Sequence, residues 1–194
     1  MRDISVLPPT LTGPSPLRVL HITNMYPSAE RPNWGVFIRS QVESLATCGI
    51  ASEVIEIEGW RSRLDYARAL LALPGRVERA KVDLVHVHYG LSAIAARRIA
   101  DLPMVVSFCG NDLLGEPDAA GRISFGSRMM VHWGRYAARR AQVIIVKSDE
   151  MGRCLGPEFT DVEVIANGVD LDFFAPMPRA EARCLLYTSD AADE

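Results

Sequence analysis

Four short segments of the sequence place a glycine beside polar residues, each directly after a run of aliphatic or β-branched residues. They are the segment from Asn24 to Gly35, His88-Tyr89-Gly90, Cys109-Gly110-Asn111-Asp112 and Asn167-Gly168-Val169-Asp170. Gly35 opens an apolar helical pattern, and a glycine there lets an anionic group approach the unpaired N–H groups of a helix N-terminus. The alternative for Gly35 is a loop glycine with positive φ. Together the four segments predict one binding site.

The side chains near these glycines allow more than one interpretation. His86 and His88 lie two residues apart on a predicted strand and so share a face; we interpret His86 as packed beneath a helix and His88 as a site residue at the strand tip. The sequence nominates no third or fourth metal ligand for this pair, so no metal site is predicted. Asp112 stands at the rim of a cleft or serves as a helix cap or Asx turn. Cys109 is interpreted as a small buried residue, because no base is evident beside it.

Strands alternate with helices between these segments. This order predicts an α/β fold, a Rossmann-like doubly wound parallel sheet covered by helices on both faces, with ligands at the carboxyl ends of the strands. The second expected helix is broken at Pro74-Gly75, with a further turn to Ala80. The expected strands are residues 17–23, 51–57, 82–89, 104–108, 143–146 and 162–165, and the expected helices are 36–46, 61–73, 92–100, 126–141 and 150–155.

Composition excludes several classes of protein. The chain has 194 residues, a net charge of −3 and a hydrophobic fraction of 48%, which suits one soluble domain and argues against a nucleic-acid partner. Its apolar runs are far shorter than the about 20 residues of a membrane span. Neither a GxGxxG nor a Walker A motif occurs. The four cysteines show no CxxC pairing, which favours reduced thiols in a cytoplasm.

The two ends differ from the rest of the chain. Residues 1–16 contain Pro8, Pro9, Pro14 and Pro16 and are predicted to be a disordered leader. Residues 184–194 interrupt a helical start at 179–183 and resemble the translation of a common sequencing adapter, so we expect a non-native tail there.

The predicted helix at 126–141 carries a basic stripe. Arg128, His132, Arg135 and Arg139 share one side of it. We interpret such a stripe first as a helix face in contact with solvent. The alternative, because aromatic residues lie beside it, is peripheral contact with an anionic membrane.

Several motifs occur in a characteristic order. They are 17–22 with Tyr26-Pro27, Gly35 opening a helix, 83–88, 105–112, and 164–170 with Phe174 and Pro176. In this order and spacing, the chain from Leu17 to Arg183 resembles the N-terminal domain of family-four glycosyltransferases. The Asn-Gly-Val-Asp…Phe-x-Pro element is the most distinctive part of the resemblance.

The resemblance implies the N-terminal half of a GT-B fold, with a C-terminal donor-binding domain missing. Residues 17–175 would form the domain, Asn167 would lie at its end, and 176–183 would begin the linker. Gly35 would lie near the diphosphate of a nucleotide-sugar donor. His88, Gly110 and Asp112 would face the sugar and acceptor side of the cleft. Cys109 stands where the family has a histidine, which puts the usual role of that position in doubt.

The resemblance also implies an activity. The parent protein would be a hexosyl-type glycosyltransferase that transfers sugar from a nucleotide sugar to a glycan, lipid-linked or small-molecule acceptor, with retention of configuration and without a metal or other cofactor. His88 and Asp112 are the catalytic candidates, and the fragment is expected to be inactive alone. We expect a cytoplasmic location, at the inner face of the membrane. The alternatives are a sugar-nucleotide epimerase of GT-B fold and a non-catalytic Rossmann-like binding module.

Overall fold

A seven-stranded sheet forms the centre of the computed structural model, which describes residues 1–6, 17–62, 64–99 and 101–187. The strand order is β1-β3-β2-β4-β5-β6-β7, and every neighbouring pair except β1 and β3 is parallel. The α/β fold with a mostly parallel sheet is therefore confirmed. The strands are β1 (Arg2–Val6), β2 (Arg18–Thr23), β3 (Ala51–Glu56), β4 (Leu84–His88), β5 (Met104–Ser107), β6 (Val143–Val146) and β7 (Val162–Val164).

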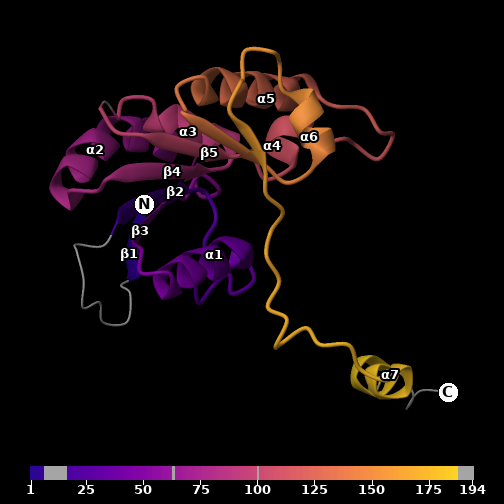
Figure 1. Cartoon of the computed structure of the whole chain (residues 1–194). Helices are drawn as coiled ribbons and strands as arrows, with labels where there is room; N and C mark the ends of the chain where they lie inside the picture. Colours follow the sequence, from indigo (N-terminus) through magenta and orange to yellow (C-terminus); the bar gives the residue numbers. More distant parts are fainter. Residues whose placement is uncertain (7–16, 63, 100, 188–194) are drawn as a thin grey trace.

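Helices cover both faces of the sheet. Helices α2, α3 and α5 lie along one face, and α1 lies on the opposite face (Figure 1). Leu20, Val85 and Val87 point into the larger core on the side of α2 and α3, whereas Val54 packs with α1. The helices are α1 (Val36–Thr47), α2 (Leu64–Ala80), α3 (Gly90–Ala96), α4 (Asn111–Leu114), α5 (Phe125–Ala138), α6 (Asp149–Cys154) and α7 (Arg179–Tyr187). None of these helices is long and apolar enough to cross a membrane.

The N-terminal residues correct the prediction of a disordered leader. Residues 2–6 form β1, which pairs antiparallel with β3 at the edge of the sheet. Ile4 packs against the core beneath α1, and the side chain of Arg2 forms an ion pair with Glu56 at 2.8 Å. These contacts compensate for the ordering of the strand. Residues 7–16, where the prolines lie, are outside the described residues.

Helix α2 corrects a second prediction, because it continues through Pro74 instead of ending there. Proline removes one backbone hydrogen bond from a helix. The helix buries Ala69 and Leu73 before this point and Val77 after it, all on one side. The apolar contacts of that side hold the two parts in one helix, because packing supplies most helical stability in proteins.

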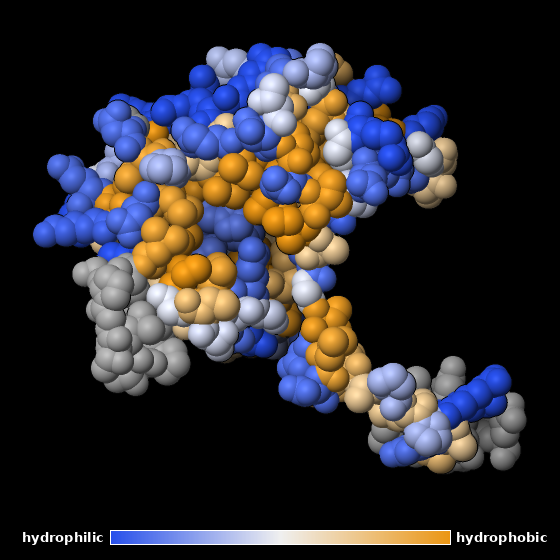
Figure 2. Space-filling model, viewed as in Figure 1, coloured by the Kyte–Doolittle hydropathy of each residue, from blue (hydrophilic) through white to orange (hydrophobic). Residues whose placement is uncertain are grey.

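Beyond β7 the chain leaves the body of the molecule. An extended segment leads to α7, which lies apart from the sheet (Figure 1). Leu171, Phe173 and Phe174 on this segment are exposed, and Figure 2 shows the apolar side chains gathered along it. Helix α7 continues past Arg183 to Tyr187; the rest of the predicted non-native tail, 188–194, lies outside the described residues.

Candidate functional site

The carboxyl ends of three central strands meet at one edge of the sheet. Strands β2, β4 and β5 are neighbours, with Ile22 beside Val87 and His88 beside Ser107 in the parallel register. The segments that carry Gly35, Gly90 and Gly110 follow these strands. We call this the carboxyl edge, and it is where a parallel α/β sheet places its ligands.

Gly35 stands directly before α1 and has a left-handed backbone, with φ of +69°. A Cβ atom at this position would lie 2.6 Å from the carbonyl oxygen of Met25. Both the backbone and the lack of space therefore require glycine. No side chain caps the first turn of α1, and that turn contains no acidic residue. Its N–H groups are thus suited to an anionic ligand.

Asp112 joins the loops that follow β4 and β5. One of its carboxylate oxygens accepts a hydrogen bond from the backbone N–H of Gly90 at 2.7 Å, and the other accepts from Cys109 at 2.9 Å and Gly110 at 2.8 Å. The side chain is only 3% exposed and lies in the first turn of the short helix α4, which the sequence did not predict. Asp112 therefore shapes the carboxyl edge from within, instead of standing free at its rim.

Burial and hydrogen bonding act in opposite directions on Asp112. Burial raises the pKa of the carboxyl group, while the N–H groups of Gly90, Cys109 and Gly110 lower it by stabilising the carboxylate. The three donated bonds require an acceptor at both oxygens, so the geometry suits the ionised form.

The backbone next to Asp112 is strained. Tyr89 has a φ of +78°, which is uncommon for a residue with a side chain. This conformation turns the chain so that the N–H of Gly90 points at Asp112. A Cβ atom on Gly90 would lie 2.8 Å from the ring of Phe108, so glycine is needed here too. Strain of this kind is concentrated at functional sites.

Cys109 and Lys147 lie close to this group. Burial raises the pKa of the Cys109 thiol to about 12, which agrees with the interpretation of an unreactive residue. Lys147 follows β6, is half-buried and interacts electrostatically with both Cys109 and Asp112; burial lowers its pKa. This lysine was not among the predicted site residues. Its position directly after a buried strand, next to the edge, was the pattern that could have found it.

The histidines correct the expectation that His88 faces the cleft. His88 is only 1% exposed, and its Nε2 lies 3.1 Å from Nδ1 of His21, which the sequence analysis did not single out. Nε2 of His21 contacts the hydroxyl of Ser52 at 3.2 Å, and Nε2 of His86 contacts that of Ser107 at 2.8 Å. His86 is buried, as expected. Side-chain alternation places these rings on the α1 face of the sheet.

The three rings are neutral near pH 7. Burial lowers the pKa of His21 to about 4 and that of His86 to about 3, and it lowers the pKa of His88 well below its usual value. A neutral histidine inside the sheet is no general acid for a substrate outside it, so His88 is not placed to act on a substrate in the cleft.

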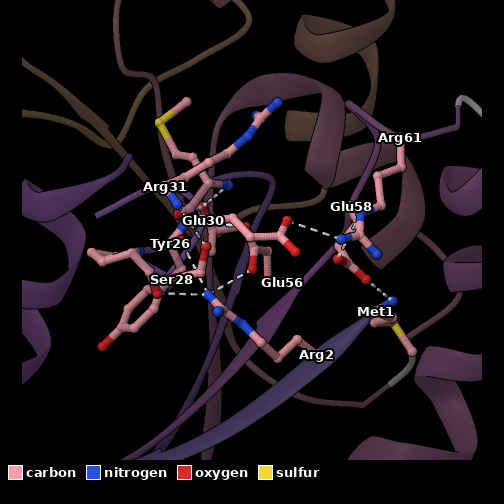
Figure 3. A network of polar contacts seen from close by, with 12 residues as sticks. Met1, Arg2, Tyr26, Ser28, Glu30, Arg31, Glu56, Glu58 and Arg61 are labelled. Carbon is pink, nitrogen blue, oxygen red and sulfur yellow. Dashed lines mark hydrogen bonds and ion pairs between the residues drawn. The ribbon is translucent and has the colours of Figure 1, made fainter. Parts of the chain in front are cut away.

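A pocket of about 290 Å³ opens beside the ends of β2 and β3. The network beneath it is drawn in Figure 3. Arg2 donates hydrogen bonds to the carbonyl oxygens of Tyr26 and Pro27 at 3.1 and 2.8 Å and pairs with Glu56, which in turn accepts from the N–H of Tyr26. The Met1 ammonium pairs with Glu58 at 2.9 Å. Strand β1 thus holds the loop that leads to α1.

Arg31 is the cation at the mouth of this pocket. Its guanidinium carbon lies 3.5 Å from the ring centroid of Trp60 and 5.1 Å from that of Trp34. Contacts of this kind hold an arginine in place without neutralising its charge. The two tryptophan side chains are 39% and 41% exposed. Arg31 and Trp34 lie within the predicted segment 24–35 but were not singled out there, and Trp60 was not predicted; its position three residues after the expected strand 51–57 was the available pattern.

Two other predicted features lie apart from the pocket. On α5, Arg135 and Arg139 both pair with Glu158, at 3.4 and 3.2 Å, so Glu158 offsets part of the basic stripe. Asn167 is exposed, beyond β7.

A further cavity, of about 430 Å³, lies over β1 and β3 and is lined by Arg18, Arg76 and Arg79 among others. It is away from the carboxyl edge.

Comparison with solved structures shows the same fold in a known enzyme. Sucrose-phosphate synthase from Thermosynechococcus elongatus matches with a TM-score of 0.64 and 14% identity over 88% of this chain and 52% of its own. A second solved chain of that synthase, 97% covered, matches over the same share of this chain with a TM-score of 0.55 and 14% identity. The chain therefore spans about half the length of the first structure. The likeness shows a GT-B glycosyltransferase fold.

Sequence comparison gives the family. No curated protein matches the chain. The model of Glycosyltransferase Family 4 matches residues 23–173, which include the whole carboxyl edge described above. This chain belongs to glycosyltransferase family 4.

Proposed function

We propose that this chain is the acceptor-side half of an enzyme that transfers a sugar from a nucleotide sugar to an acceptor, with retention of configuration. The observation that carries the proposal is that Gly35, Gly90 and Gly110 lie in the segments that follow three neighbouring parallel strands, in a chain of this family. Retention and a hexosyl donor are the expectations of the family resemblance. We propose that the transfer step itself needs no metal.

The chemistry of such a transfer is the separation of charge. The bond between the sugar and the nucleotide diphosphate breaks, so negative charge grows on the leaving diphosphate and positive charge on the sugar carbon. The N–H groups at the start of α1 behind Gly35 suit the diphosphate. Lys147 adds a positive charge at the same edge. The N–H groups are fixed in the helix before the reaction, which is the arrangement that stabilises developing charge.

The pocket beside the ends of β2 and β3 is the proposed binding site for the acceptor. Trp60 and Arg31 line this pocket, and the Arg31 guanidinium, stacked on the Trp60 ring, has N–H groups that can donate hydrogen bonds to the hydroxyl groups of a sugar. We propose that a glycan, lipid-linked or small-molecule acceptor binds here. Contact of the enzyme with an anionic membrane has less support, because Glu158 pairs with two arginines of the α5 stripe.

The donor-binding part is proposed to lie on a second domain. The chain spans 52% of the sucrose-phosphate synthase chain, and the exposed apolar residues Leu171, Phe173 and Phe174 suit contact with a further domain. We therefore propose that the chain alone turns over no sugar. All four cysteines are free, which supports the proposed reducing, cytoplasmic location.

The test is to incubate the longer protein with labelled nucleotide sugars and a panel of acceptors. We expect label in a product with retained configuration. Epimerised donor without transfer would support an epimerase, and no reaction with any donor would overturn the enzyme assignment. Trp60→Ala should raise the acceptor KM with kcat little changed, while Trp133→Ala, a 47% exposed tryptophan on α5, should change neither.

A further inference from the structure

Three of the four histidines of the chain meet inside the sheet. They come from two neighbouring strands: His21 from β2, and His86 and His88 from β4. One ring nitrogen from each of the three lies within 4.8 Å of those of the other two, and all three side chains are buried. We call this group the histidine cluster. The histidine cluster takes no part in the proposed transfer chemistry, so that chemistry does not explain why three histidines lie together.

We propose that the histidine cluster binds one Zn²⁺ ion, which ties β2 to β4. Imidazole nitrogens are preferred ligands of zinc. Around a tetrahedral zinc with Zn–N bonds of about 2.0–2.1 Å, neighbouring ligand atoms are about 3.4 Å apart. Nδ1 of His21 and Nε2 of His88 are 3.1 Å apart, so this pair already has nearly the required spacing.

The remaining ring needs only a small adjustment. Because the three ligand atoms all lie within 4.8 Å of one another, a movement of one ring by about 1–2 Å brings them to zinc spacing. His86 lies next to His88 with ring centroids 4.1 Å apart and can turn toward the pair. Three histidines leave a fourth position for an oxygen, and the Ser107 hydroxyl, 2.8 Å from Nε2 of His86, is nearby.

Partners around the cluster resemble those of known metal sites. The ring of His21 uses Nε2, the nitrogen that does not face His88, to contact the hydroxyl of Ser52. A hydrogen bond to the distant ring nitrogen is the usual way in which proteins orient a metal-binding histidine.

One charged group opposes the binding of a cation. Lys147 is close enough to act electrostatically on His86 and His88. It is half-buried, and its charge lowers the affinity of the cluster for zinc without blocking the ring nitrogens. We expect a structural role for the ion, since it would lie in the interior and away from the proposed transfer step.

The experiment uses the whole chain after removal of metals with a chelator. The three exposed cysteines, Cys48, Cys154 and Cys184, are changed to serine, because free thiols also bind zinc. The protein is dialysed against micromolar zinc, bound metal is counted by mass spectrometry, and thermal unfolding is followed with and without the ion. We expect about one zinc per chain and a higher Tm, because an ion that binds only the folded state stabilises it.

Two variants locate the bound ion. His88→Gln should weaken zinc binding by at least about tenfold, whereas His132→Gln, which changes the one histidine outside the cluster, should not. If the folded chain that keeps all four histidines retains no zinc, the proposal is overturned. This outcome does not depend on whether a histidine variant folds. Full zinc retention by His88→Gln also overturns it, because the ion would then be bound elsewhere.

Discussion

The carboxylate of Asp112 accepts a hydrogen bond from the backbone N–H of Gly90 at 2.7 Å, across 22 residues of sequence. This bond connects the loop after β4 with the loop after β5, and both loops form the carboxyl edge. An acidic residue in such a place invites a catalytic assignment. Its two oxygens are instead occupied by three backbone groups, so its role is to position the edge.

Loss of this carboxylate should destabilise the fold. Asp112→Ala leaves the N–H groups of Gly90, Cys109 and Gly110 without their acceptor, and each unsatisfied buried donor costs about 1–3 kcal/mol. Because water reaches part of this loop, we expect a total loss of about 3 kcal/mol in the free energy of unfolding, measured in urea.

Asn at this position should give an intermediate result. Asp112→Asn keeps one oxygen, which can serve Cys109 and Gly110, but its amide group cannot accept from Gly90. Asp172→Ala is the matched control, because Asp172 is exposed and its carboxylate makes no hydrogen bond among the described residues. Equal stability of the Asp112→Ala and Asp172→Ala variants would show that the three bonds contribute nothing.

Gly35 should not tolerate a side chain. In Gly35→Ala the backbone keeps a strained left-handed conformation, and the new Cβ atom clashes with the carbonyl oxygen of Met25. We expect a loss of about 1–3 kcal/mol in the unfolding free energy and, in the longer protein, a raised KM for the nucleotide sugar. Gly168→Ala has open space around it and serves as the control. An unchanged donor KM in a folded Gly35→Ala enzyme would remove this glycine from the proposed diphosphate site.

The close approach of α3 and α5 should depend on Gly134. A Cβ atom there would lie 3.2 Å from the Cα and carbonyl carbon of Gly90, and such overpacking costs about 1–3 kcal/mol. Gly75→Ala, in the middle of α2 with no atom nearer than 3.7 Å, should instead stabilise the protein by about 0.5–1 kcal/mol. Thermal unfolding of the two variants should therefore shift Tm in opposite directions.

The Cys109 thiol should resist alkylation. With a pKa of about 12, only about one thiol in ten thousand is ionised at pH 8, and the thiolate is the reactive form. Iodoacetamide at pH 8 should label the exposed Cys48 and Cys154 and leave Cys109 unmodified, as read by peptide mass spectrometry. Labelling of Cys109 at the same rate as Cys48 would mean that the thiol is accessible and its pKa ordinary.

Most of the fold could be predicted because its elements are clearly patterned. Strand β6 is a short run of β-branched residues, and β4 alternates valine with histidine; such local patterns need no long-range information. Helix α4 has only four residues, too few for a periodic pattern. Strand β1 was missed because the nearby prolines dominate residues 1–16, although Ile4 and Val6 alternate with polar residues as an edge strand requires.

The site could be predicted only in part, for a different reason. The glycines were found because backbone geometry restricts which residue can occupy such positions. The direction of the His88 side chain depends on which face of β4 is covered and on the pairing of β4 with β2, which places His86 beside His21. That register depends on pairing between distant parts of the chain, and a single sequence does not show which distant residues pair.

Gly90 is held from two sides, by Asp112 through its N–H and by the backbone of Gly134 against its Cα. A shift of the Gly90 backbone would stretch its hydrogen bond to Asp112 or separate α3 from α5. This part of the carboxyl edge is thereby stiff before any ligand arrives. Under the proposed function, selectivity among acceptors would then come from the loops and side chains around this edge, and these are the parts in which enzymes of the same fold are free to differ.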